Sequence, residues 1–195
     1  DLTGLRQEPV DLQRYFTATL RDEVAEDGKG GWTDQGEQDL RSMPVGVRKL
    51  AGITFDVRDG CLALRSASHL KFQPAKVTGI PIGRTCAALY LLHAAAWAGA
   101  EGTAIARVRV QYGDGKEALV PVVSGVNVGD WWTPVDLVQA QVAWRGPSAG
   151  GQNVGVYATT WRNPRPAAPI KSLSVESAGT DAIYLLLAVS CGLKP

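Results

Sequence analysis

Acidic residues cluster near the start of the chain, in a glycine-rich segment with no clear helix or strand period. Asp22, Glu23, Asp27, Asp34 and Asp39 bring five carboxylates close together, and neighbouring glycines add carbonyls that can also coordinate a metal. Calcium takes about six to eight oxygen ligands of these types. The order of the acids does not match an EF-hand loop. The segment predicts a structural calcium held by Asp22, Asp27, Asp34 and Asp39, and the alternative is a solvated acidic loop.

Tryptophan is the second chemically informative residue type. The chain has six tryptophans, and all lie at expected strand ends or in loops. Sugars have apolar C–H faces and polar edges, so flat exposed rings beside acid, amide or guanidinium groups suit them. The alternative is that these rings close the ends of the fold, with each indole N–H bound to backbone. The predicted ligand-binding residues are Trp131, Trp132, Trp97, Trp32, Asp130, Arg145, Asp34, Gln35 and His93.

These predicted contacts divide into two roles. We expect Trp131, Trp132 and Trp97 to stack on the ligand, and Asp130, Arg145, Asp34 and Gln35 to bind its hydroxyl groups. His93 ends an apolar run four residues before Trp97, so both can lie at the rim of a pocket; a buried, hydrogen-bonded His93 is the alternative. For Trp144 the burial alternative is favoured, because its position is in phase with inward-facing residues.

Signatures of catalysis are sparse. The only histidines are His69 and His93, and the sequence has no GxSxG motif or activated-cysteine signature. Carboxylate pairs for a glycosidase, such as Asp34 with Asp39, are not established by spacing along the chain. The sequence therefore disfavours an enzyme, although a small glycan-active enzyme stays an alternative.

Composition predicts one soluble globular domain spanning residues 1–195. The chain is 45% hydrophobic and 20% charged, with a net charge of +1 and no cluster of basic residues, so no nucleic-acid partner is expected. The longest apolar run, 182–189, is too short for a transmembrane helix. Cys61, Cys86 and Cys191 can form at most one disulfide, and buried thiols are favoured. The chain starts at Asp1 without a signal-like segment, which suggests a processed secreted protein or a piece of a longer one.

Alternating apolar and polar residues predict an all-β fold with about nine or ten short strands and one long N-terminal loop, residues 21–44. Residues 39–43 can add a helical turn before Pro44, and Asp59-Gly60 suggests a hairpin. Residues 87–98 have good helix propensity, but their flanks favour a strand. A short strand is also expected within 15–20. The main expected strands are 53–57, 61–64, 77–82, 86–92, 106–112, 118–122, 138–144, 154–161, 173–175 and 182–189.

Several motifs are spread over residues 10–190. They are Gly-Trp-Thr-Asp-Gln-Gly at 31–36, Asp-Leu-Arg at 39–41, residues 50–57, Leu-Leu-His at 91–93 with Ala96-Trp97, Tyr-Gly-Asp-Gly at 112–115, residues 126–132 and Trp-Arg-Asn-Pro-Arg-Pro at 161–166. Together these motifs resemble the accessory β-sandwich domains of large bacterial carbohydrate-active enzymes. This resemblance implies a galactose-binding-like jelly roll, the fold of many carbohydrate-binding modules. It also implies a non-catalytic part of a multidomain secreted glycoside hydrolase or polysaccharide lyase, and in many members a structural calcium.

The sequence thus leads to a carbohydrate-binding module that brings an attached catalytic domain to a polysaccharide or oligosaccharide. The expected location is secreted or at a bacterial cell surface, and no membrane contact is expected. The main alternative is a structural accessory domain that packs on a catalytic domain and binds no sugar.

Overall fold

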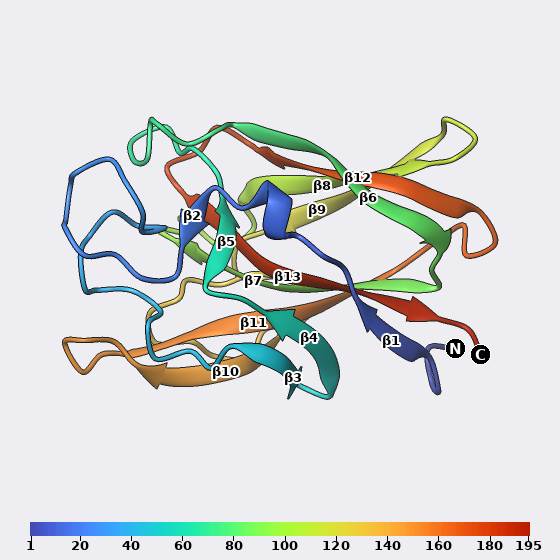
Figure 1. Cartoon of the computed structure of the whole chain (residues 1–195), viewed down its shortest axis with the longest axis horizontal. Helices are drawn as coiled ribbons and strands as arrows, with labels where there is room; N and C mark the ends of the chain where they lie inside the picture. The colour runs from blue at the N-terminus through green and yellow to red at the C-terminus, as the bar shows by residue number, and fades with distance from the viewer.

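The computed structural model describes all residues, 1–195, and its regular secondary structure is almost entirely β-strand (Figure 1). None of its helical structure is long and apolar enough to span a membrane. In chain order the elements are β1 (Arg6–Pro9), η1 (Gln13–Tyr15), β2 (Ala18–Thr19), β3 (Gly46–Leu50), β4 (Ile53–Val57), β5 (Gly60–Ala63), β6 (Lys76–Thr85), β7 (Ala88–Ala96), β8 (Ala104–Tyr112), β9 (Glu117–Val123), β10 (Gln141–Pro147), β11 (Asn153–Arg162), β12 (Pro169–Ser177) and β13 (Ile183–Leu193).

Two antiparallel sheets face each other. The larger has the order β10-β11-β7-β13-β5-β2, with β1 also paired to β13, and the smaller has the order β6-β12-β8-β9. Strands β5, β13, β7 and β11 therefore lie opposite β6, β12, β8 and β9, and the chain passes repeatedly from one sheet to the other. This is the double Greek-key arrangement of a jelly roll, so the predicted β-sandwich is confirmed.

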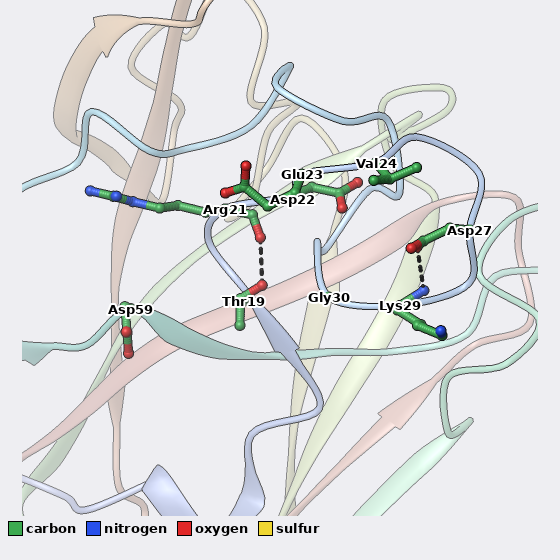
Figure 2. Close-up of a pocket in the computed structure, with 9 residues that line it drawn as sticks. All are labelled: Thr19, Arg21, Asp22, Glu23, Val24, Asp27, Lys29, Gly30 and Asp59. Carbon is green, nitrogen blue, oxygen red and sulfur yellow. Dashed lines mark hydrogen bonds between the residues drawn. The ribbon is translucent and has the colours of Figure 1, made fainter.

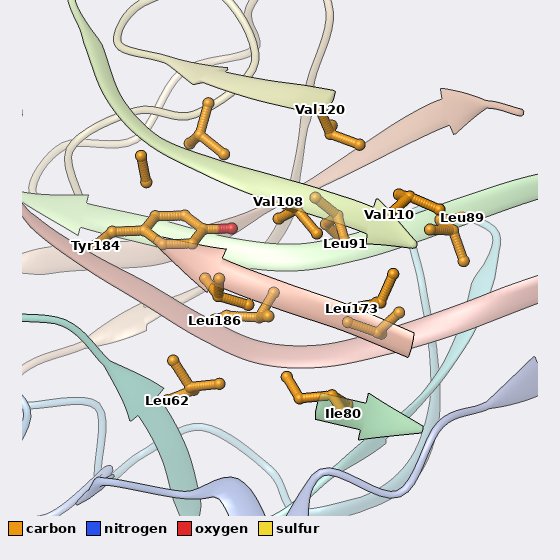
Figure 3. Close-up of a cluster of buried hydrophobic side chains, with 14 of the residues drawn as sticks. Leu62, Ile80, Leu89, Leu91, Val108, Val110, Val120, Leu173, Tyr184 and Leu186 are labelled. Carbon is orange, nitrogen blue, oxygen red and sulfur yellow. The ribbon is translucent and has the colours of Figure 1, made fainter. Parts of the chain in front are cut away.

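A sandwich core fills the space between the two sheets (Figure 3). Leu89 and Leu91 of β7 project from the larger sheet towards Val108 and Val110 of β8 in the smaller one. In each strand these residues are two apart, because successive side chains of a strand point to opposite faces. The period-2 pattern in the sequence reports this core.

A second apolar layer covers the outer face of the larger sheet. The β3–β4 hairpin and the N-terminal loop, residues 21–44, bury Phe55, Leu40 and Trp32 against that face. Strands β7 and β13 are consequently buried on both faces. Their double burial explains why 86–92 and 182–189 are continuous apolar runs instead of alternating ones. In Figure 1 the N-terminal loop lies at one end of the molecule and both termini lie at the other.

The structure decides three of the local predictions. Residues 88–96 form strand β7, so the preference for strand over helix is confirmed. The hairpin at Asp59-Gly60 is wrong: β4 pairs with β3, while β5 pairs with β2 and β13. Residues 39–43 form only a turn, in which the Met43 N–H donates to the Leu40 carbonyl over 3.0 Å, and not a helical turn.

The unpredicted hairpin partner of β4 is β3. The two strands are joined by Ala51-Gly52, with φ values of +48° and +76°. Two consecutive positive φ values are those of a type I′ turn, whose twist suits a two-residue hairpin. Strand β3 carries little apolar alternation, because most of its residues face solvent.

Candidate functional site

Predicted ligand-binding residues meet in a hollow at one end of the sandwich. This aromatic hollow has a volume of about 360 Å³. Its walls come from three segments that are distant in sequence: the N-terminal loop, the end of β7 and the connection between β9 and β10. The lining residues are Gln35, Ala96, Trp97, Asp130, Trp131 and Trp132.

Backbone pairing holds the β9–β10 connection against the end of β7. The Ala95 N–H donates to the Gly129 carbonyl over 3.0 Å, and the Trp131 N–H donates to the Ala95 carbonyl over 2.8 Å. These two bonds extend the sheet by one short parallel bridge between Ala95 and Asp130. Because β7 is a central strand of the larger sheet, these bonds fix Trp131 and the adjacent Trp132 to the sheet.

The four tryptophans near the hollow differ in exposure. Trp97 and Trp132 are 38% and 37% exposed, whereas Trp131 and Trp32 are 2% and 0% exposed. Trp131 contacts Trp32 edge to face, with ring centroids 5.0 Å apart, and also contacts Trp132 at 5.6 Å. Trp131 is therefore the floor of the hollow and part of the core, and only Trp97 and Trp132 offer ring surface to a ligand.

Trp97 is held in an unusual position. Its φ is +51°, a value that is uncommon outside glycine and that clusters at functional sites. The His69 ring stacks on it, with centroids 3.9 Å apart and 15° between planes. His69 covers one face of the indole, so the exposed part of Trp97 is its edge and its other face.

Asp130 links the two exposed tryptophans. One carboxylate oxygen accepts a hydrogen bond from the Trp132 N–H at 3.0 Å, and the other accepts one from the Ala98 N–H at 3.3 Å. The Tyr157 hydroxyl donates to the Asp130 carbonyl over 3.1 Å. Each carboxylate oxygen has a further lone pair, so Asp130 can position both aromatic residues and still accept a hydroxyl of a ligand.

Two other predicted ligand residues lie away from the hollow. Arg145 in β10 is exposed and donates to the Pro134 carbonyl, which braces the chain beyond Trp132. His93 is fully buried in the sandwich core, where Nδ1 is 2.7 Å from the Tyr184 hydroxyl and Nε2 is 2.8 Å from the Asn127 carbonyl. Burial lowers the pKa of His93 to about 4. His93 thus supports the β9–β10 connection from inside.

A second cavity, the acidic hollow, lies within the N-terminal loop and has a volume of about 390 Å³. Figure 2 shows the Asp27 carboxylate hydrogen-bonded to the Lys29 backbone, while the Arg21 side chain extends away from Asp22 and Asp27. The lining residues are Thr19, Arg21, Asp22, Glu23, Val24, Asp27, Lys29, Gly30 and Asp59.

Three of the four predicted metal ligands come together: Asp22 and Asp27 line the acidic hollow, and Asp34 lies beside them. Asp22, Asp27 and Asp34 each offer a carboxylate oxygen within 4.8 Å of the others. One oxygen of Asp34 accepts from the Gly28 N–H at 3.1 Å, but the other, Oδ1, is buried and has no hydrogen-bond partner. Burial raises the pKa of Asp34, and the charges of Asp22 and Asp27 raise it further. A hard cation fits this donor set, because it would supply the missing partner and balance the charges.

Asp39, the fourth predicted ligand, has a different position. It is fully buried in an ion pair with Arg41 at 2.9 Å, and its Oδ2 accepts from the Asp22 N–H at 2.8 Å. Asp39 therefore orients the backbone of Asp22 and does not face the other carboxylates.

His69, which stacks behind Trp97 outside the lining of the aromatic hollow, is the supporting residue that sequence reasoning missed. His69 lies in the connection between β5 and β6, whereas Trp97 follows β7, so the two residues come from different connections. No local pattern marks this contact, since it depends on two connections meeting at the same end of the fold.

Comparison of the chain with protein-family models, curated proteins and solved structures finds no match. A function must therefore be argued from the two hollows.

Proposed function

We propose that this protein is a non-catalytic carbohydrate-binding module, secreted or displayed at a bacterial cell surface. It would bring an attached glycoside hydrolase or lyase to a polysaccharide. The observation that carries the proposal is the aromatic hollow, in which Trp97 and Trp132 lie partly exposed beside Asp130 and Gln35.

The chemistry of the hollow supports this proposal. Indole rings match the C–H faces of a pyranose, and carboxylate and amide groups match its hydroxyl groups. Asp130 is already engaged by two backbone N–H groups, which suits a fixed acceptor better than a proton-transfer group. Only two ring surfaces are exposed, so affinity for one sugar should be weak after ordering costs.

The proposal includes a structural calcium at Asp22, Asp27 and Asp34. The buried, unpartnered oxygen of Asp34 supports it. Asp34 directly precedes Gln35, which lines the aromatic hollow, and Trp32 of the same loop packs on Trp131. A cation in the acidic hollow would therefore stabilise one wall of the aromatic hollow.

A glycan array of neutral and acidic polysaccharides, probed with calcium and then with EDTA, tests the proposal. The wild-type chain should bind selected glycans, and Trp97→Ala and Trp132→Ala should each lower affinity by about tenfold or more, equivalent to roughly 1.4 kcal/mol. Leu119→Ala is the matched control, because Leu119 is 50% exposed on β9 of the other sheet. The proposal would be contradicted by an array without any binding, or by tryptophan variants that both bind as tightly as the wild-type chain.

One observation favours the alternative of an accessory domain that packs on a catalytic domain. A groove of about 580 Å³ runs between the β3–β4 hairpin and β10–β11, lined in part by Ile53 and Leu137, and Val138 at its rim is 82% exposed. A groove with an exposed apolar side chain at its rim offers an anchor point for a partner protein. A blank array together with loss of binding to a supplied catalytic domain on Val138→Asp would favour this function.

A further inference from the structure

A further cavity, distinct from the acidic hollow, adjoins the aromatic hollow and shares two of its residues. We call it the second hollow. It has a volume of about 250 Å³, and both cavities are lined by Asp130 and Trp132. The remaining walls of this second hollow include Gly99, Glu101, Ser124 and Tyr157. Trp132 is therefore a wall common to two neighbouring cavities, and not the outer edge of one.

The second hollow has a closely packed base beneath an open, partly exposed rim. A Cβ at Gly129 would lie 2.4 Å from the Tyr157 hydroxyl oxygen, so only glycine lets Tyr157 reach the Asp130 carbonyl. Thr133, also in its lining, has a φ of +46°, which for a β-branched residue is a true outlier. Trp97 and Thr133 thus place backbone strain on both sides of Trp132, and such strain is concentrated at ligand sites.

Charge narrows the class of ligand. The linings of the two hollows contain the carboxylates of Asp130 and Glu101, and no Lys, Arg or His side chain. A sugar carboxylate or sulfate would meet the like charge of these two carboxylates, because the neighbouring guanidinium of Arg145 lies outside both linings and donates to the Pro134 carbonyl. Hydroxyl groups, in contrast, can donate hydrogen bonds to both carboxylates.

We propose that the aromatic hollow and the second hollow form one continuous site for a neutral, linear oligosaccharide. One sugar unit occupies the aromatic hollow, the next occupies the second hollow, and Trp132 contacts both. This inference rests on the proposed carbohydrate-binding function and adds the length and charge of its ligand.

Calorimetric titrations with defined sugars test the inference. The probes are glucose, xylose, mannose and galactose, their β-linked oligomers of two to six units, and oligogalacturonates as charged comparators. For at least one neutral series, affinity should rise about tenfold or more between the monosaccharide and the dimer. Longer oligomers should gain little more, because two sugar units already fill the two hollows. Oligogalacturonates should bind about tenfold more weakly than the best neutral oligomer of equal length.

A variant separates the two hollows. Glu101→Ala should lower affinity for the neutral dimer by about three- to tenfold and leave the monosaccharide unaffected, because Glu101 lines only the second hollow. Glu117→Ala, on β9 of the smaller sheet, is the control and should change neither. Equal affinities for monosaccharide and dimer, or preference for oligogalacturonate, would overturn the inference and leave carbohydrate binding in place. Absence of binding to every sugar would overturn both.

Discussion

The aromatic hollow and the acidic hollow differ in how completely the folded chain provides hydrogen-bond partners for their polar groups. In the aromatic hollow, Asp130 has backbone donors on both carboxylate oxygens and Trp131 anchors the floor in the core. Beside the acidic hollow, Asp34 converges with the lining residues Asp22 and Asp27, and one buried oxygen of Asp34 has no hydrogen-bond partner. The first is held by packing and by backbone hydrogen bonds, whereas the second gathers negative charge that a cation would balance. The two should therefore respond to different perturbations.

Loss of the hollow's floor should have the largest effect. Trp131 is 2% exposed and joins Trp32 of the N-terminal loop to Trp132. Trp131→Ala should lower the free energy of unfolding by roughly 3–5 kcal/mol, the usual cost of a buried Trp-to-Ala cavity. Urea denaturation measures this, and Trp132→Ala, at an exposed position, is the control with an expected loss below about 1 kcal/mol. A stable Trp131→Ala variant that lost only binding would make Trp131 a ligand platform instead.

Most core strands could be predicted from the sequence because their burial pattern is local, whereas β1 and the solvent-facing β3 could not. Leu89 and Leu91 alternate with residues that face the second apolar layer, and this double burial leaves β7 continuously apolar. Chemistry-bearing residue types also indicated part of the site, since Trp97, Trp132, Asp130 and Gln35 do meet in one cavity.

Contacts between connections that are distant along the chain could not be predicted from the sequence. Trp131 and Trp132 are adjacent and chemically alike, yet one is buried because Trp32 packs on it, and the other is exposed. Arg145 is bound to a nearby carbonyl, and His69 reaches Trp97 from another connection. Each of these outcomes depends on loop placement, which has no sequence period.

The buried histidine should make the aromatic side of the molecule sensitive to pH. The pKa of His93 is lowered by burial from 6.5 to about 4 in the folded chain. The unfolded chain binds a proton first as pH falls, so this contribution to stability is complete above pH 6.5 and is lost towards pH 4. Its size is roughly 3 kcal/mol, from about 1.4 kcal/mol for each pH unit.

Urea denaturation of wild type and His93→Gln between pH 4 and 7.5 tests this effect. The glutamine amide can still donate to the Asn127 carbonyl but does not titrate. The difference in stability between the two proteins should shrink or reverse as pH falls through the window. A constant difference would mean that His93 keeps an ordinary pKa in the folded chain.

Calcium should act first on the acidic hollow and on the N-terminal loop that forms it. At a concentration 100 times its dissociation constant, it should stabilise the folded chain by about 2.7 kcal/mol, and EDTA should remove the gain. The gain should fall with decreasing pH, beginning above the range of an ordinary carboxyl, because Asp34 has a raised pKa and binds calcium only when ionised.

Substitutions identify the cation site. Asp34→Asn should abolish the calcium gain and be neutral or stabilising in EDTA, because it removes repulsion from Asp22 and Asp27. Glu23→Gln is the control, since Glu23 lines the hollow but lies outside the carboxylate cluster, and most of the gain should remain. Equal thermal unfolding curves with calcium and with EDTA would instead leave a solvated acidic loop.

The smallest effect should come from the contact behind Trp97. His69 stacks on this ring at 3.9 Å and lies outside both the aromatic and the acidic linings. An aromatic pair of this kind contributes about 0.5–1.5 kcal/mol, so His69→Ala should weaken glycan binding several-fold by letting the indole move. His69→Phe should restore affinity because it rebuilds the stack, while the calcium response stays unchanged in both variants. Calorimetry gives the affinity and thermal unfolding gives the calcium response. If His69→Ala bound as tightly as wild type, the strained backbone at Trp97 would be sufficient to hold the ring, and the aromatic hollow would depend even less on side chains outside it.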